Sequence, residues 1–102
     1  MKVKIYIGNK CVPCARLKQW LADAKRDTKY NKWNDAMQYL HSIVFVNVDI
    51  EQEKKEYLIQ LGVKSVPCMI EQSDDMLERP GGYLGYDNIV FRLEEELNNV
   101  RN

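Results

Sequence analysis

The chain has 102 residues, of which 45% are hydrophobic and 29% are charged, and its formal net charge is zero. This length is enough for one compact core and too short for two, so we expect a single domain over 1–102. The balanced charge argues against nucleic acid or an anionic membrane as a partner. The longest apolar run, 43–46, is far below the ~20 residues of a membrane span, and the first residues lack the long apolar segment of a signal peptide. We therefore expect a soluble, cytoplasmic monomer.

The first 24 residues change from the period of a strand to that of a helix. Apolar and polar residues alternate over 2–7, as in a strand with one buried face. Gly8-Asn9-Lys10 ends this pattern. The apolar residues that follow recur at the spacing of an amphipathic helix: Leu17, Trp20, Leu21 and Ala24. Pro13 is compatible with this helix because it falls in the first turn, where its missing N–H has no partner to lose.

Two further elements follow a polar stretch over 25–32. Trp33, Ala36, Met37 and Leu40 repeat the helical spacing, which predicts a second, short helix over 33–40. We expect Trp33 and Met37 to pack in the core. The next segment, 43–48, is β-branched and apolar at nearly every position. Such a run is typical of a central strand that is covered on both faces.

The last part of the chain predicts a helix, a hairpin and a final helix. The first helix covers 51–61 and ends at Gly62. The hairpin has arms at 68–70 and 76–79. In the final helix Asp87 is the expected N-cap, and Ile89, Leu93 and Leu97 recur every four residues. The order β, α, α, β, α, β, β, α predicts an α/β fold with a mixed sheet and helices on its faces.

Cys11 and Cys14 form the sequence Cys-Val-Pro-Cys between the first strand and the first helix. Two thiols at this spacing can close a tight disulfide and exchange it with partners. The third cysteine, Cys68, makes an odd count, which argues for reactive thiols rather than a structural disulfide framework. The alternative is a zinc site. It needs four ligands, and the chain offers only Cys68 and His41 as further candidates, so a redox pair is the favoured interpretation.

Three features together resemble the thioredoxin fold in its short, glutaredoxin-like form. The first is the element order with Cys-Val-Pro-Cys between the first strand and helix. The second is Val48-Asp49-Ile50 followed by 61–67, which ends in Ser-Val-Pro like the loop that carries the cis-proline of that family. The third is Gly85-Tyr86-Asp87 before the last helix. The resemblance implies a central, mixed, four-stranded sheet flanked by helices, with 33–40 as one extra short helix.

The sequence also departs from both branches of the family. Lys10 stands where thioredoxins usually have a tryptophan, and the chain starts at the first core strand. Dithiol glutaredoxins commonly read Cys-Pro-Tyr-Cys, whereas Pro13 occupies the place of the proline in thioredoxins. Small hybrid thioredoxins and glutaredoxins, including those of bacteriophages and those that serve ribonucleotide reductase, are therefore the nearest resemblance.

The chemistry of such a site requires a thiolate, whereas a free cysteine has a pKa of about 8.5. Cys11 falls at the expected N-terminus of the first long helix, where unpaired amides and the helix dipole stabilise an anion, and Lys10 adds a positive neighbour. We assign Cys11 as the attacking thiol. Cys14, one turn further along, is the resolving thiol and should be the more buried sulfur.

The resemblance supplies roles for several neighbours. Pro67 is implied to be cis and to lie opposite Cys11, and the backbone of Val66 to pair with a bound peptide or glutathione as an added strand. The residues implied to support substrate binding are Lys10, Val12, Pro13, Val66, Pro67, Gly85 and Asp87. No bound cofactor is expected. Glutathione or a thioredoxin reductase is the expected source of electrons, and disulfide-containing proteins, with ribonucleotide reductase as a candidate, are the expected substrates.

Three alternatives stay open at this point. Gly81-Gly82 and the start of the last helix either bind the carboxylates of glutathione or form a simple turn. Cys68 is either a third redox thiol or a small buried residue that starts a strand. The whole chain is either a thiol-disulfide oxidoreductase or a non-catalytic binding module that holds a partner with the 33–40 helix.

Overall fold

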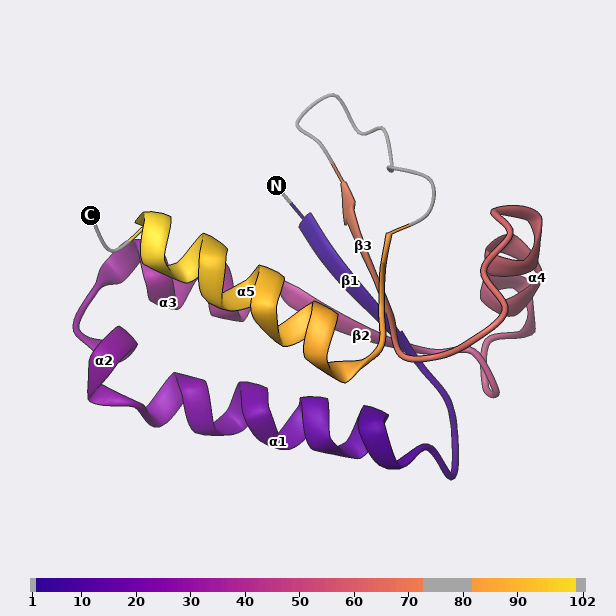
Figure 1. The fold of residues 1–102 in the computed structure, drawn as a ribbon, viewed down its shortest axis with the longest axis horizontal. Helices are drawn as coiled ribbons and strands as arrows, with labels where there is room; N and C mark the ends of the chain where they lie inside the picture. Colours follow the sequence, from indigo (N-terminus) through magenta and orange to yellow (C-terminus); the bar gives the residue numbers. More distant parts are fainter. Residues whose placement is uncertain (1, 73–81, 101–102) are drawn as a thin grey trace.

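The computed structural model describes residues 2–72 and 82–100, which form a four-stranded sheet with helices on both faces (Figure 1). The elements in chain order are β1 (Lys2–Ile7), α1 (Val12–Arg26), α2 (Thr28–Asn31), α3 (Asn34–His41), β2 (Ile43–Asn47), α4 (Gln52–Gln60), β3 (Cys68–Gln72), β4 (Tyr83–Leu84) and α5 (Tyr86–Val100). The predicted α/β class and mixed sheet are confirmed. No helix among the described residues is long and apolar enough to cross a membrane.

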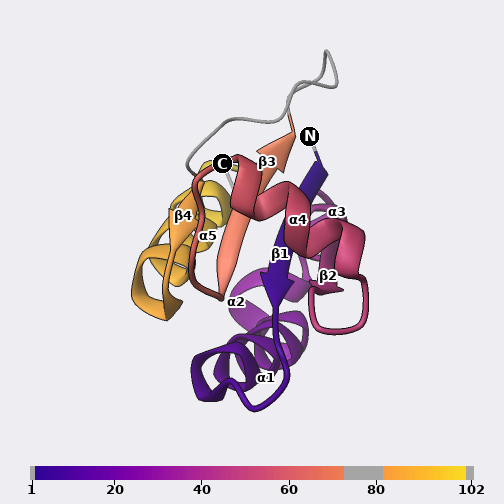
Figure 2. The ribbon, with the colours of Figure 1, turned by 90° about the vertical axis from the view of Figure 1, so that its right-hand side faces the viewer.

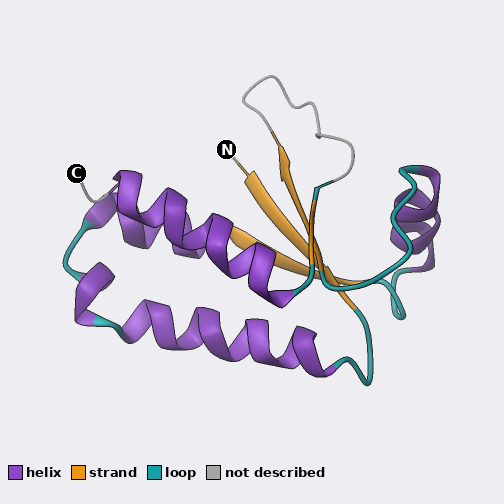
Figure 3. Cartoon of the chain, viewed as in Figure 1, coloured by secondary structure: helices purple, strands orange, loops and turns teal. Residues whose placement is uncertain are grey.

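The sheet has the strand order β2-β1-β3-β4 (Figure 2), and Figure 3 shows its strands in orange. β1 runs parallel to β2 and antiparallel to β3, and β3 runs antiparallel to β4. β1 is therefore a central strand with both faces covered, and Ile5 and Tyr6, which point to opposite faces, are each 1% exposed. The prediction of one buried face for this strand was wrong, because the aromatic ring of Tyr6 is part of the core.

β2 is an edge strand, which corrects the prediction that 43–48 forms a central one. Val44 is 54% exposed although it lies in the most apolar run of the chain. A continuous apolar run indicates a strand, but it does not show whether a neighbour pairs with each edge.

The two faces of the sheet are covered by different helices. The long helices α1 and α5 and the shorter α3 cover one face, where their buried residues Leu17, Leu40 and Leu93 pack in one cluster with Ile5. The other face is covered by α4, whose Leu58 packs with Tyr6 and Val46 (Figure 2). Helices α1 and α5 run in the same direction, from right to left in Figure 1, so the positive ends of their dipoles lie on the same side.

The polar stretch 25–32 contains the short helix α2, which was not predicted. Asp27 caps it, with its Oδ1 accepting the backbone N–H of Lys29 at 2.9 Å. Tyr30 anchors the turn in the core and is 4% exposed. One buried aromatic residue in a polar segment leaves no periodic signal, which is why the sequence pattern missed this helix.

The extra helix predicted over 33–40 is α3, and most of its apolar residues pack inward. Ala36 and Leu40 are fully buried, and Met37 packs against the same core cluster. Trp33 differs from the prediction, because it precedes the helix and is 41% exposed.

The strand that pairs with β3 is β4, in which Leu84 lies opposite Cys68. The predicted second arm over 76–79, like Gly81, lies outside the described residues. Gly82 precedes β4 with a positive φ of 30°, and a Cβ at this position would collide with the carbonyl oxygen of Met69. The turn alternative for Gly82 therefore has a steric basis: close approach of two backbones requires glycine.

An ion pair buried between β3 and α5 was not predicted. Glu71 is 4% exposed and accepts two hydrogen bonds from Arg92, at 2.8 Å from Nε and 3.3 Å from Nη2. Arg92 also contacts Glu95 and Glu96 at 3.1 and 3.0 Å. This network ties β3 to the last helix, α5.

Candidate functional site

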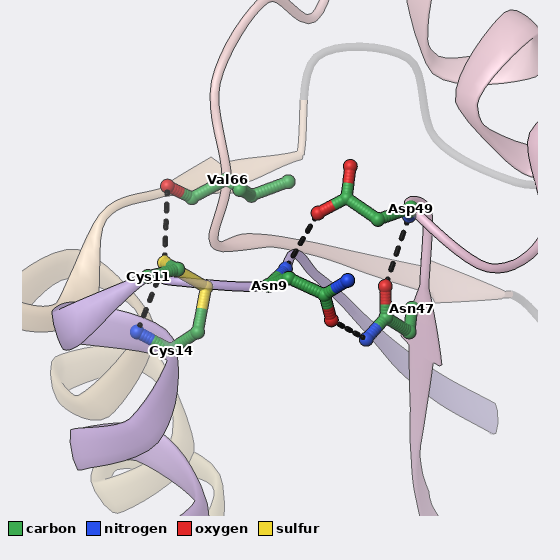
Figure 4. The surroundings of a disulfide bond; sticks show 6 residues. All are labelled: Asn9, Cys11, Cys14, Asn47, Asp49 and Val66. Carbon is green, nitrogen blue, oxygen red and sulfur yellow. Dashed lines mark hydrogen bonds between the residues drawn. A yellow bond between two sulfur atoms is a disulfide. The ribbon is translucent and has the colours of Figure 1, made fainter.

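Cys11 and Cys14 lie where β1 passes into α1 and are joined by a disulfide bond (Figure 4). The backbone turns sharply before them, since Lys10 has a positive φ of 52°. Cys11 is extended and occupies the N-cap of α1, and Cys14 follows one helical turn later at a Cα–Cα distance of 5.2 Å. Pro13 sits in the first turn, as expected. Cys14 is 2% exposed and Cys11 is partly exposed, so the expected difference in burial between the two sulfurs is confirmed.

The sulfur of Cys11 is surrounded by polar backbone groups. It accepts the N–H of Cys14 at 3.2 Å, which is the N-cap hydrogen bond of α1. The carbonyl oxygen of Val66 lies 3.9 Å from the same sulfur (Figure 4). A disulfide sulfur carries no proton, so this second contact becomes a hydrogen bond only when Cys11 is a reduced thiol. One neighbour thus favours the anion, and the other can accept the proton of the thiol.

The loop that supplies Val66 is anchored on its other side by the start of α5. The Val66–Pro67 peptide bond is cis, as the sequence predicted, and Pro67 is buried. The N–H of Gly85 donates to the carbonyl oxygen of Pro67 at 3.0 Å. Gly85 has a φ of 85°, a conformation that glycine adopts without strain. These bonds hold the Val66 carbonyl beside Cys11.

The remaining predicted site residues lie around this centre. Lys10, Val12 and Pro13 are exposed beside the disulfide, and Val12 has 72% of its surface accessible. Asp87 is exposed, but α5 begins at Tyr86, so Asp87 lies in the first turn of the helix and is not its N-cap. The guanidinium of Arg16 stacks on the ring of Tyr86, with its Cζ 4.2 Å from the ring centroid. This contact joins the first turns of α1 and α5.

The loop before Cys11 is held by a hydrogen-bond network that the sequence interpretation missed. The N–H of Asn9 donates to Asp49 Oδ2 at 2.5 Å, and Asn47 Nδ2 donates to Asn9 Oδ1 at 3.0 Å (Figure 4). The N–H of Asp49 in turn donates to Asn47 Oδ1 at 2.9 Å. The network forms because β1 and β2 are parallel, so that polar residues at or just after the end of each strand meet at one edge of the sheet. The sequence pattern did not show this pairing.

Cys68 lies on the opposite side of the sheet from the disulfide. It is fully buried in the cluster under α4 with Tyr6, whereas Cys14 packs in the cluster under α1. Burial raises the pKa of the Cys68 thiol to about 11. The structure therefore supports the alternative in which Cys68 is a small buried strand residue.

Two hollows share Gly8 in their lining, and one of them contains the disulfide. One, of about 510 Å³, is lined by Cys11, Cys14 and the start of α1. The other, of about 330 Å³, lies beside Val66 against α4. Among the described residues, no group of three or more His, Cys, Asp or Glu side chains is arranged to hold a metal ion.

Comparisons with known proteins give one informative match. No family model and no curated protein matches the chain. Among solved structures, the C-terminal domain of Neisseria meningitidis DsbD in the reduced form superposes with a TM-score of 0.57 over 92% of this chain and 78% of that chain, at 16% sequence identity. A malarial protein superposes with a TM-score of only 0.45, at 16% identity over 92% of each chain, and carries no argument. At these identities the likeness concerns the fold alone, and it shows that this chain has a thioredoxin-like fold with a Cys-x-x-Cys disulfide at the start of its first long helix.

Proposed function

We propose that the chain is a thiol-disulfide oxidoreductase that reduces disulfides in other proteins. The observation that carries this proposal is the disulfide itself, placed at a helix N-terminus with one sulfur accessible and the other buried. Only the accessible sulfur can meet a substrate. The buried sulfur can react only within the chain. Disulfide exchange requires these two roles, one thiol that attacks the substrate and one that resolves the mixed disulfide.

The reaction begins with both thiols of the reduced protein. The Cys11 thiolate attacks one sulfur of the substrate disulfide, a mixed disulfide forms, and the other substrate sulfur leaves as a thiolate that takes up a proton. Cys14, after losing its proton, attacks Cys11 Sγ and expels the second substrate thiolate. Two electrons and two protons have then passed to the substrate, and the protein holds the Cys11–Cys14 bond seen in the structure.

The anionic form of Cys11 has three sources of stabilisation in this mechanism. The N–H of Cys14 points at Cys11 Sγ, and the positive end of the α1 dipole lies at the same place. Lys10 adds a cation one residue away in the sequence. These groups increase the fraction of Cys11 that is present as the attacking thiolate.

The Val66–Pro67 segment supports the binding of an extended substrate. The carbonyl oxygen of Val66 lies 3.9 Å from Cys11 Sγ. A substrate strand that pairs with the backbone of Val66 therefore brings its own cysteine to the attacking sulfur. Val12, Pro13, Gly85 and Asp87 surround this position and complete the proposed contact surface.

The rest of the expected cycle belongs to the same proposal. Glutathione or a thioredoxin reductase returns the disulfide to the dithiol, and a cytoplasmic protein disulfide, such as that of ribonucleotide reductase, is the substrate. Glutathione binding is the less supported of the two sources of electrons, because the steric demand at Gly82 already accounts for a glycine there.

Reduction of insulin disulfides by dithiothreitol tests the proposed activity. The protein should accelerate the precipitation of the insulin B chain several-fold over the reductant alone, in proportion to its concentration. The matched control is the same protein after reduction and alkylation with iodoacetamide, which should add nothing to the rate. If unmodified protein is no faster than the reductant alone, the proposal is wrong.

A further inference from the structure

The charged residues around the disulfide are predominantly basic. Within the described part of the chain, the charged residues that line the two hollows are Lys10, Lys18, Lys55, Lys64 and Asp49. All four lysine side chains are exposed. The whole chain, in contrast, has 15 basic and 15 acidic residues. The excess of positive charge is therefore a local property of the lining of these two hollows, which does not include Asp87 at the start of α5.

The one carboxylate in this set, Asp49, is exposed and binds the loop before Cys11. Its Oδ2 accepts the backbone N–H of Asn9 at 2.5 Å, and against this single negative charge the two hollows have four lysines in their lining. The exposed acidic residues Glu53 and Glu56 of α4 line neither hollow. A ligand that lies across Cys11 and Val66 thus meets Lys10 and Lys18 in the hollow at the disulfide, and Lys55 and Lys64 in the hollow at Val66.

The buried part of the lining of the hollow beside Val66 is apolar. Val48, Leu58 and Val63 line it and are 6%, 4% and 5% exposed, while Lys55 and Lys64 stand at the same opening. Its volume of about 330 Å³ accommodates one large apolar side chain. Apolar lining with a few charged groups at the mouth is the usual composition of a site that fixes one side chain and selects its neighbours.

We propose that this face recognises an acidic, extended, cysteine-containing segment of the partner protein. The segment places its cysteine at Cys11 Sγ, an apolar side chain in the hollow beside Val66, and aspartate or glutamate residues against the lysines on either side. This inference rests on the proposed oxidoreductase function and names the class of substrate segment that the same site selects. Charge complementarity with the four lysines favours an acidic segment over a neutral or basic one.

The expected signature is a rate that depends on charge and on salt. Complementary charge accelerates association by about tenfold or more at low ionic strength. The effect fades as the Debye length shrinks from about 30 Å at 0.01 M to about 3 Å at 1 M salt.

Three synthetic peptides, each with one intramolecular disulfide and the same apolar residue, provide the test. They differ only in the residues that flank the cysteines, which are aspartate, asparagine or lysine. The second-order rate constant for oxidation of the reduced protein is measured by stopped-flow fluorescence at low and high salt. At low salt we expect the aspartate peptide to react about tenfold faster than the asparagine peptide and the lysine peptide to react slowest, with the three rates converging at high salt.

Two double variants locate the effect. Lys55→Gln with Lys64→Gln should bring the rate of the aspartate peptide down towards that of the asparagine peptide. The matched control, Lys29→Gln with Lys32→Gln, removes the same charge near α2, at the end of α1 away from the disulfide, and should preserve the preference (Figure 1).

The outcomes separate this inference from the proposed function. Equal rates for the aspartate and asparagine peptides at low salt overturn the inference and leave the oxidoreductase proposal standing. Loss of the preference in the control variant also overturns it, because the effect then reflects net charge and not this surface. If none of the three peptides oxidises the reduced protein, the proposed function itself is wrong.

Discussion

Replacing Cys14 with serine is expected to convert the protein from a catalyst into a trap. Cys11 remains at the N-terminus of α1 and still attacks the substrate, but the sulfur that would release the mixed disulfide is gone. Insulin reduction should fall to the rate of the reductant alone, and a covalent adduct of one protein and one substrate chain should accumulate. Non-reducing electrophoresis followed by mass spectrometry should place the link at Cys11.

The matched variants sharpen this expectation. Cys11→Ser should abolish both turnover and adduct, since the buried Cys14 cannot reach a substrate. Cys68→Ser should keep turnover and give no adduct, because Cys68 lies across the sheet in the other core cluster. An adduct that persists when Cys11 and Cys14 are both serine contradicts the assignment of the attacking sulfur.

Among substitutions outside the apolar core, Arg92→Met should cause the largest loss of unfolding free energy. Glu71 is 4% exposed, and its carboxylate accepts two hydrogen bonds from the guanidinium of Arg92. Methionine leaves the carboxylate buried without its counter-charge, for which the expected loss is about 3–5 kcal/mol of unfolding free energy. Guanidinium denaturation of the oxidised protein measures this loss.

Two comparisons show whether the loss comes from the buried charge. Arg26→Met removes a pair with Asp23 whose side chains are 72% and 61% exposed, and should change stability by less than about 1 kcal/mol. Glu71→Leu combined with Arg92→Met should recover much of the loss, because no charge is then left buried. If Arg92→Met is no more destabilising than Arg26→Met, the ion pair does not hold β3 to α5.

The disulfide and its immediate surroundings could be predicted because they follow from local chemistry. The Cys-Val-Pro-Cys spacing places both sulfurs within one helical turn, and Ser65-Val66-Pro67 marks the loop that faces them. The apolar stripes of α1 and α5 are equally local, since the buried residues of each helix recur every three or four positions. Such features depend on neighbours in the sequence, and the fold keeps them.

Features that depend on pairing across the sheet could not be predicted. The apolar run of β2 indicated a strand but not that its outer edge is unpaired by other described strands. The hydrogen bonds from Asn9 and Asn47 required knowledge that β1 and β2 are parallel. The partner of Glu71 is Arg92, which is 21 residues away, and neither residue carries a pattern that identifies the other.

The most direct measurement is a single turnover followed by mass mapping of all three cysteines. Fully reduced protein is mixed with an equimolar model disulfide, quenched with acid and alkylated. We predict that one substrate disulfide is reduced for each protein oxidised, that Cys11 and Cys14 are recovered as one disulfide-linked peptide, and that Cys68 is recovered in its alkylated form. Recovery of a disulfide that includes Cys68, or of three alkylated cysteines after the substrate has been consumed, would contradict the assignment of Cys11 and Cys14 as the redox pair.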